Sequence, residues 1–68
     1  MSIAKVIELS AESEKSFEDA IQQGIAGATE TLDNVRSAWV NEQQVIVKDN
    51  KIQCYRVNLK VTFVVERG

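Results

Sequence analysis

The chain has 68 residues, with no histidine, no proline, one cysteine and a formal net charge of −2. A chain of this size buries only about 60% of its unfolded surface, so its own core is marginal and association with other chains is expected to stabilise it. The composition excludes an intrachain disulfide and a histidine-based zinc or acid–base site, and the negative charge gives no reason to expect nucleic acid as a partner.

The chain is expected to form a single cytoplasmic domain spanning residues 1–68. Its one thiol suits a reducing compartment. The first apolar stretch is interrupted by Lys5 and Glu8, and no basic segment precedes it as in a signal peptide. No apolar run approaches the roughly 18 residues that cross a membrane. A membrane is therefore not expected as a partner.

Residues 3–10 are predicted to form the first strand, although their alternation of apolar and polar side chains is imperfect. Ser13 is predicted to begin a helix, because a serine oxygen can accept a hydrogen bond from an exposed backbone N–H of the first turn. Glu14 follows and suits the positive end of the helix dipole. The helix is expected to end near residues 33–34.

An apolar stripe supports this helix, because its residues recur at spacings of three and four. The stripe consists of Phe17, Ala20, Ile21, Gly24, Ile25, Ala28 and Leu32. Gly24 and Gly27 lie inside the helix, where each glycine costs up to about 1 kcal/mol relative to alanine. Two interpretations stay open: the glycines allow a sheet or a neighbouring subunit to approach closely, or they are merely tolerated.

Residues 35–48 are predicted to form a long second strand. Asp49 and Asn50 are predicted to form a two-residue hairpin turn, since both residue types tolerate the positive φ of such turns. The third strand begins at Ile52 and is the clearest element of the chain. Over residues 55–65 its apolar and polar side chains largely alternate, which places them on opposite faces of a sheet.

The turn fixes which residues of these two strands face each other. The predicted pairs are Val40–Leu59 and Ala38–Val61 on the apolar face, and Trp39–Lys60, Asn41–Asn58 and Ser37–Thr62 on the polar face. Nearer the turn the pattern slips, because several apolar side chains fall on the face opposite to that of Tyr55. These side chains are Val45, Val47, Ile52 and Cys54. A β-bulge or a strong twist is therefore predicted near Gln43 and Gln44.

The order strand, helix, strand, strand predicts an α+β fold, in which a three-stranded antiparallel sheet wraps around one helix. The helical connection is long enough to be a crossover, so the third strand is expected between the first and second. One helix covers only one face of such a sheet. The apolar residues left uncovered in a single chain are Trp39, Val45, Val47 and Ile52. Exposed apolar patches of this kind indicate a partner surface, and we expect a homo-oligomer.

The chain contains no Ser-His-Asp set, no Cys-His pair and no glycine-rich phosphate loop, so an enzyme is not expected. Trp39, Arg56 and Lys60 are predicted to share one sheet face, where a cation over an indole gains roughly 0.5–2 kcal/mol. The indole is either buried at a subunit interface or serves as a ring on which a ligand stacks. The carboxylates that allow a metal site in an assembly, or are simply solvated, are Glu8, Asp19, Glu42 and Asp49. Cys54 is interpreted as a small strand residue.

Four segments together resemble the dodecin family, and they cover nearly the whole chain in order. The segments are Lys5–Leu9, Ser13–Ala20, Ala28–Val35 and Tyr55–Phe63. The resemblance implies a three-stranded antiparallel sheet wrapped around one helix and a hollow homododecamer. It also implies that flavins bind in pairs between subunits, in a protein that stores flavin and quenches its photochemistry.

The chain departs from the flavin-binding pattern of that family at its main contacts. The position of the tryptophan that stacks on the isoalloxazine ring is occupied by Ser37, and Trp39 lies two residues, or about 6–7 Å, further along the strand. The position of the glutamine that binds the polar edge of the ring is occupied by Arg56. In these respects the chain resembles a branch that lacks the stacking tryptophan, one member of which is described as a calcium dodecin.

The resemblance implies FMN or riboflavin in a modified pocket between subunits, with FMN favoured if Arg56 reaches its phosphate. The candidate flavin-binding residues are Arg36, Ser37, Trp39, Gln43, Arg56 and Lys60. The alternative is a flavin-free shell that binds a metal ion or another small ligand.

Overall fold

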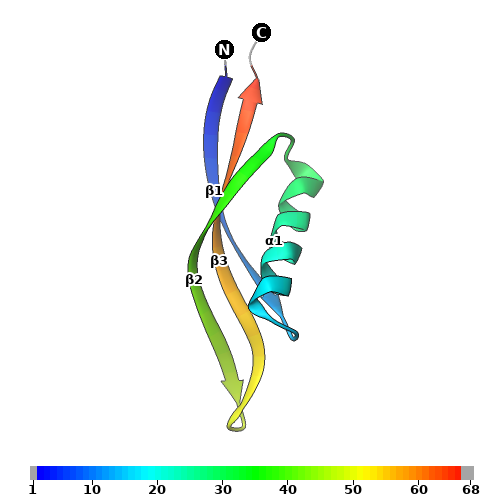
Figure 1. The fold of residues 1–68 in the computed structure, drawn as a ribbon, viewed down its shortest axis with the longest axis vertical. Coiled ribbons are helices and arrows are strands. Elements are labelled where there is room, and N and C mark those ends of the chain that lie inside the picture. The colour runs from blue at the N-terminus through cyan, green and yellow to red at the C-terminus, as the bar shows by residue number, and fades with distance from the viewer. Residues whose placement is uncertain (1, 67–68) are drawn as a thin grey trace.

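A three-stranded sheet and one helix make up the computed structural model, which describes residues 2–66. The elements are β1 (Ser2–Ser13), α1 (Phe17–Thr31), β2 (Val35–Lys48) and β3 (Lys51–Glu66). The strand order is β1-β3-β2, and both outer strands run antiparallel to β3. The helix lies along the middle of a long, twisted sheet, both ends of which project beyond it (Figure 1). The predicted α+β fold with a central third strand is confirmed.

The helix begins three residues later than Ser13, the predicted start. Ser16 is the N-cap, and its Oγ accepts a hydrogen bond from the backbone N–H of Asp19 at 2.9 Å. Ser13 instead ends β1, where it pairs with Tyr55 of β3. Both serines can cap a helix, but pairing with the long third strand extends β1 past its predicted end and leaves the capping role to Ser16.

The turn between β1 and α1 is fixed by hydrogen bonds to Asp19. Its Oδ2 accepts from the Ser13 hydroxyl at 2.5 Å and from the Gln23 amide at 2.6 Å. The hydrogen bond from Ser13, followed by that from Gln23, lowers the pKa of Asp19. A negative charge therefore stays at the N-terminal end of the helix, where the dipole favours it.

The helix also ends earlier than predicted. Its last residue is Thr31, and the N–H of the C-cap Leu32 donates to the Ala28 carbonyl at 3.0 Å. Asn34 follows with a φ of 60°. Leu32 is already extended, with a φ of −113° and a ψ of 133°, so the helix does not continue to residues 33–34. The left-handed backbone of Asn34 then turns the chain into β2.

The core lies between the apolar stripe of α1 and the alternate residues of β3. Val57, Leu59 and Val61 are fully buried, and they contact the buried Ala20 and Ala28 of the helix. The remaining members of the predicted stripe, apart from Gly24, pack around this cluster: Phe17, Ile21, Ile25 and Leu32. The predicted inner faces of the helix and of β3 are both confirmed.

The two helix glycines differ in their surroundings. A Cβ atom on Gly24 would come 2.8 Å from Leu59 Cδ1 and 3.2 Å from the Cβ of Ala11, whereas one on Gly27 would meet nothing within 4 Å. Close approach of helix and sheet therefore explains Gly24. Within the described chain, Gly27 has no such role.

The hairpin between β2 and β3 has the predicted turn and, at its far end, the predicted register. Asp49 and Asn50 have φ angles of 53° and 63°, as a tight two-residue turn requires. The confirmed pairs are Ser37–Thr62, Ala38–Val61, Trp39–Lys60 and Val40–Leu59. The bulge lies between Val40 and Glu42, somewhat before the position predicted for it.

The earlier bulge changes which face the following residues occupy. Glu42, not Asn41, is opposite Asn58, although the Asn41 amide still donates to Asn58 Oδ1 at 3.0 Å. Val45 is opposite Tyr55, so the prediction that it faces away from Tyr55 is wrong. One inserted residue moves all later side chains to the other face until a second irregularity, between Ile46 and Val47, restores the register.

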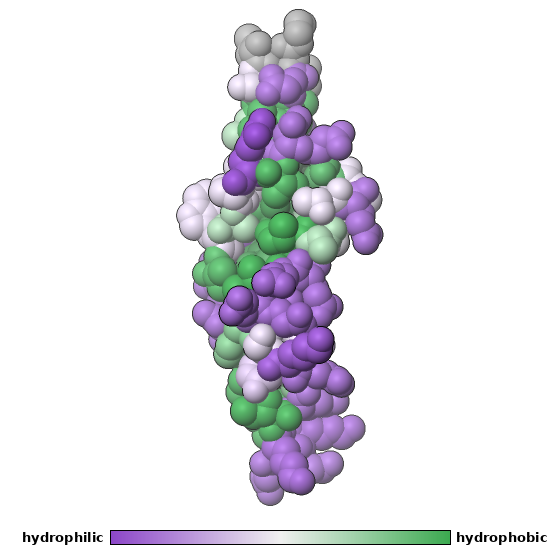
Figure 2. Space-filling model, turned by 45° about the vertical axis from the view of Figure 1, so that its right-hand side comes forward, coloured by the Kyte–Doolittle hydropathy of each residue, from purple (hydrophilic) through white to green (hydrophobic). Residues whose placement is uncertain are grey.

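Large apolar side chains remain exposed where α1 does not reach. Trp39 is 61% exposed, Val47 59% and Ile52 55%. Apolar surface runs in patches along the molecule, including one near its hairpin end (Figure 2). The expectation that these residues are uncovered in a single chain is confirmed. Within residues 2–66, no helix is long and apolar enough to cross a membrane.

Candidate functional site

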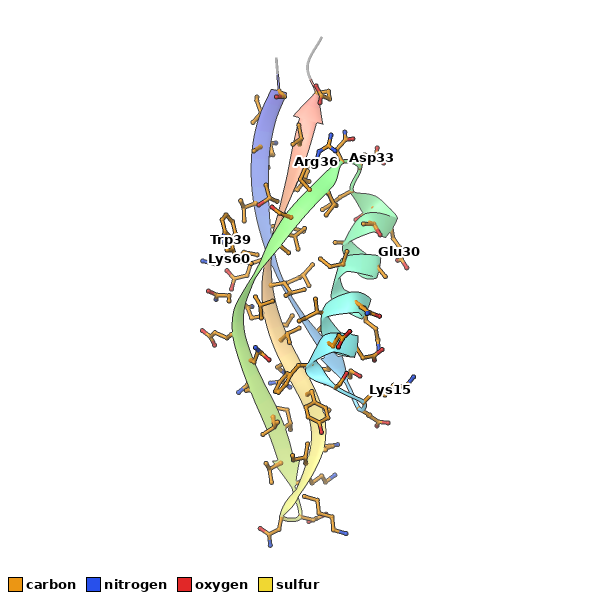
Figure 3. The ribbon with its side chains drawn as sticks, viewed as in Figure 1. Lys15, Glu30, Asp33, Arg36, Trp39 and Lys60 are labelled. Carbon is orange, nitrogen blue, oxygen red and sulfur yellow. The ribbon has the colours of Figure 1, made fainter. Side chains whose placement is uncertain are left out.

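The side of the sheet that points away from α1 is here called the open sheet face. It carries most of the polar and charged side chains that could contact a ligand. Cross-strand pairing arranges them in three rows across β1, β3 and β2. The rows are Glu8–Lys60–Trp39, Ser10–Asn58–Glu42 and Glu12–Arg56–Gln44. In Figure 3, Trp39 and Lys60 point together away from the helix. Strand pairing thus gathers residues far apart in the sequence.

The first row offers an aromatic surface beside a cation. The register places Lys60 between Glu8 on one side and Trp39 on the other. Lys60 is half-buried, whereas the indole is largely open to solvent. An exposed indole next to an ammonium group can receive a planar ligand or the surface of a second chain.

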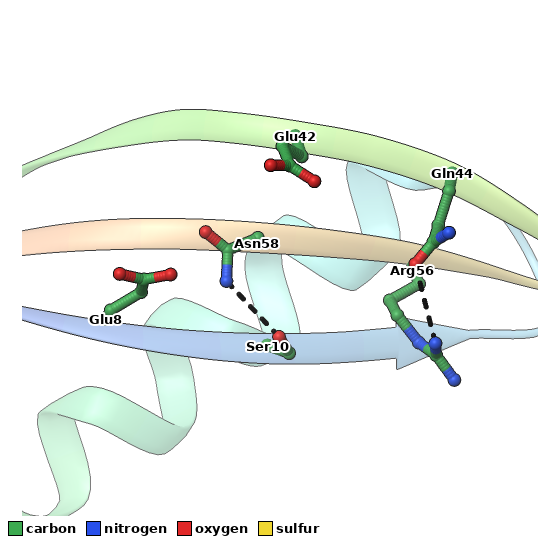
Figure 4. A pocket seen from close by; sticks show the side chains of 6 residues that line it. All are labelled: Glu8, Ser10, Glu42, Gln44, Arg56 and Asn58. Carbon is green, nitrogen blue, oxygen red and sulfur yellow. Dashed lines mark hydrogen bonds between the residues drawn. The ribbon is translucent and has the colours of Figure 1, made fainter.

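The second row forms the floor of a shallow hollow of about 300 Å³ (Figure 4). The hollow is lined by Glu8, Ser10, Glu42, Gln44, Arg56 and Asn58. The Asn58 amide donates to the Ser10 hydroxyl at 3.4 Å. Neither Glu8 nor Glu42 forms an ion pair within the described part of the chain. The hollow therefore presents oxygen atoms and negative charge.

In the third row, Glu12 and Gln44 both contact the guanidinium group of Arg56. Its Nε donates to Glu12 Oε1 at 2.6 Å, its Nη2 forms an ion pair with the same oxygen, and its Nη1 donates to Gln44 Oε1 at 3.5 Å. The Arg56 and Glu12 side chains are 39% and 48% exposed. All three guanidinium nitrogens already have partners in the chain, and the carboxylate offsets the positive charge.

Cys54 lies beside this row without the properties of a nucleophile. It is buried, and its Sγ is 3.7 Å from Glu12 Oε2. Burial, and then the charge of Glu12, raise the pKa of the Cys54 thiol. The thiol is therefore protonated at neutral pH, in agreement with its interpretation as a small strand residue.

The structure brings four of the six predicted flavin-binding residues to the open sheet face: Ser37, Trp39, Arg56 and Lys60. Gln43 is opposite Val57, on the side of the sheet that carries the core, because the bulge precedes it. Arg36 lies at an irregularity at the start of β2, close to Asp33 in Figure 3, and does not line the hollow.

Sequence reasoning missed several residues of the open sheet face. Ser10, Glu12, Gln44 and Asn58 were not proposed, and Glu8 and Glu42 were considered only as metal ligands. The alternation of β1, had it been paired with β3, would have indicated Glu8, Ser10 and Glu12. No signal in the sequence distinguishes Gln44 from Gln43 without the position of the bulge. Within residues 2–66, no three Cys, Asp or Glu side chains gather as a metal site.

The described residues form a small α+β domain whose open sheet face offers an exposed indole and hydrogen-bonding side chains. The family model described as Dodecin matches residues 3–66, and the chain belongs to the dodecin family.

Three similar proteins support this assignment. The calcium dodecin of Mycobacterium tuberculosis is 35% identical over 63 residues, which cover 93% of this chain and 89% of that protein. A Thermus thermophilus protein of known structure is 31% identical, with a TM-score of 0.92 and all of both chains covered. The dodecin of Streptomyces davaonensis is 27% identical, with a TM-score of 0.92 and 97% of each chain covered.

Proposed function

We propose that the chain is a binding and storage protein that assembles into a homododecamer and holds a flavin between subunits on the open sheet face. Family membership supports binding without catalysis. The observation that supports a flavin as the ligand is the exposed indole of Trp39, which lies beside Lys60 on the open sheet face. The single unpaired thiol suits the cytoplasm as the site of this function.

Self-association follows from the apolar surface outside the helix. Val47 and Ile52 are more than half exposed at the hairpin end, and burying them in a neighbouring chain would stabilise an assembly. Burial of this surface in an assembly would add to the small core of so short a chain.

Light scattering after size exclusion is expected to give a mass near that of a dodecamer. Val47→Lys should shift the protein to smaller species, because a buried unpaired charge costs several kcal/mol. Gln53→Lys is the matched control: it adds the same charge to an exposed polar position of the same hairpin and should leave the mass unchanged. A monomeric parent protein at micromolar concentration would refute the assembly.

The flavin is proposed to stack on Trp39, not at the family position occupied by Ser37. Ser37 lies one row away, opposite Thr62, and offers no aromatic surface. Because the Nε–Nη2 edge of Arg56 is held by Glu12 and Nη1 contacts Gln44, less of the guanidinium group is available for the ring or for a phosphate. Binding should therefore be weaker than in a site with the full stacking pair.

Titration of riboflavin and FMN, followed by quenching of flavin fluorescence, is expected to show weak binding of both. Ser37→Trp should tighten binding about tenfold, and Trp39→Ala should weaken it by a similar factor, since stacking of a planar ring on an aromatic side chain contributes about 1–3 kcal/mol. Trp39→Phe keeps a ring and is the matched control. No response to either flavin, even with Ser37→Trp, would eliminate the flavin as ligand.

A divalent cation is the second candidate ligand. Glu8 and Glu42, which have no ion-pair partner among residues 2–66, place carboxylates around the hollow beside the oxygens of Ser10 and Asn58, and Ca²⁺ prefers such oxygen ligands. The relative named calcium dodecin favours the same candidate. Elemental analysis and an absorbance spectrum of the purified protein distinguish the flavin from the cation. A stoichiometric metal with no yellow chromophore would support the cation.

A further inference from the structure

We propose that Glu12 sets the charge preference of the open sheet face: by holding Arg56 it makes the site favour an uncharged flavin such as riboflavin over a phosphorylated one such as FMN. This inference rests on the proposed flavin site. It assigns to Glu12 a role in specificity and reverses the FMN preference expected from the sequence.

The geometry commits the Nε–Nη2 edge of Arg56 to Glu12. A phosphate is best recognised by two parallel N–H donors of a guanidinium group. In this chain Nε and Nη2 both point to Glu12 Oε1, and Nη1 points to Gln44. To bind a phosphate through this edge, Arg56 would have to give up Glu12 as its partner, and binding through the remaining N–H groups would still place the anion close to the Glu12 carboxylate.

The other charged side chains around the hollow also disfavour a phosphate. Glu8 and Glu42 line the hollow without ion-pair partners in the described residues, and Lys60 is the neighbouring cation. With Arg56 offset by Glu12, the hollow and its edge carry a negative excess. A phosphate is repelled there, whereas the neutral ribityl chain of riboflavin can hydrogen-bond to Asn58 and Ser10.

The preference should be moderate, because the ion pair is partly exposed. Breaking an ion pair at the surface, and placing a phosphate near a solvated carboxylate, each change affinity by up to about fivefold. Together they predict that removing the Glu12 charge raises the affinity for FMN relative to riboflavin by about tenfold.

Glu12→Gln tests this role, because it removes the charge and keeps the shape of the side chain. Riboflavin and FMN are titrated against the parent protein and the variant in the assembled state, and the ratio of the two affinities is compared. Glu8→Gln is the matched control: it removes one charge from the same face without releasing Arg56, so it should give a smaller gain for FMN than Glu12→Gln. An equal gain for FMN in Glu8→Gln would overturn the specific role of Glu12.

Inorganic phosphate gives a second readout that needs no flavin. Phosphorus NMR should detect phosphate binding to Glu12→Gln but not to the parent, and Glu12→Gln combined with Arg56→Gln should lose it. If this holds while no variant binds a flavin, the role of Glu12 stands and the flavin function fails. If Glu12→Gln gains neither phosphate nor FMN, the inference is overturned.

The thiol of Cys54 reports whether the variant has removed the intended carboxylate. Glu12 is the second cause, after burial, of the raised pKa of Cys54. In Glu12→Gln the pKa of this thiol, followed by its rate of reaction with a disulfide reagent against pH, should fall. An unchanged pKa would place Glu12 away from Cys54 and Arg56 and would contradict the geometry.

Discussion

Replacing Leu59 with alanine is expected to lower the free energy of unfolding by about 2–5 kcal/mol. Leu59 is fully buried in β3 and belongs to the cluster that α1 covers. Truncation removes buried apolar surface and leaves a cavity, because the flanking Val57 and Val61 are held by the sheet and cannot fill it. Thermal or denaturant unfolding at a fixed protein concentration measures the loss.

Val40→Ala is the matched control for Leu59→Ala. Val40 is the direct strand partner of Leu59 on the same side of the sheet, but it is 43% exposed. Its truncation should cost less than about 1 kcal/mol. Phe17→Ala should fall in between, since Phe17 is only half-buried and stacks edge-on against Tyr55 at 5.1 Å. Equal unfolding curves for Leu59→Ala and the parent would place the core elsewhere.

The fold was largely predictable because the apolar pattern of this chain has a clear period in its main elements. The alternating apolar residues of β3 and the apolar stripe of α1 pack into the same core. The Asp49–Asn50 turn correctly predicts the pairing next to the turn and again over Ser37–Val40, but not between the two irregularities. These are local properties of the sequence. The helix start was harder, because Ser13 and Ser16 are equally good caps and only pairing with Tyr55 decides between them.

The candidate site was less predictable because it depends on the bulge and on β1. A bulge between Val40 and Glu42 determines that Gln44 reaches Arg56 and that Gln43 does not. The polar run of residues 41–44 has no apolar side chain to reveal which residue is inserted. The partner of Arg56 comes from β1, more than forty residues away, so only the sheet topology connects it to Glu12.

Gly24→Ala and Gly27→Ala are expected to change stability in opposite directions. Both replacements favour the helix by about 0.5–1 kcal/mol, because glycine is the more flexible residue in the unfolded chain. At Gly27 the added methyl group meets nothing within 4 Å, so the gain should appear in full as a higher free energy of unfolding. At Gly24 the same methyl group would lie 2.8 Å from Leu59 Cδ1.

Overpacking decides the result at Gly24. Leu59 cannot turn aside freely, because it is fully buried, and the Cβ of Ala11 and Cδ1 of Leu9 stand only 3.2 and 3.3 Å from the added atom. Overpacking of a well-packed core costs about 1–3 kcal/mol, which exceeds the helix gain. Unfolding of both variants at one concentration measures the difference, expected near 2 kcal/mol. A stabilised Gly24→Ala would mean that the helix lifts from the sheet easily, whereas a destabilised Gly27→Ala would indicate that another chain covers this helix surface.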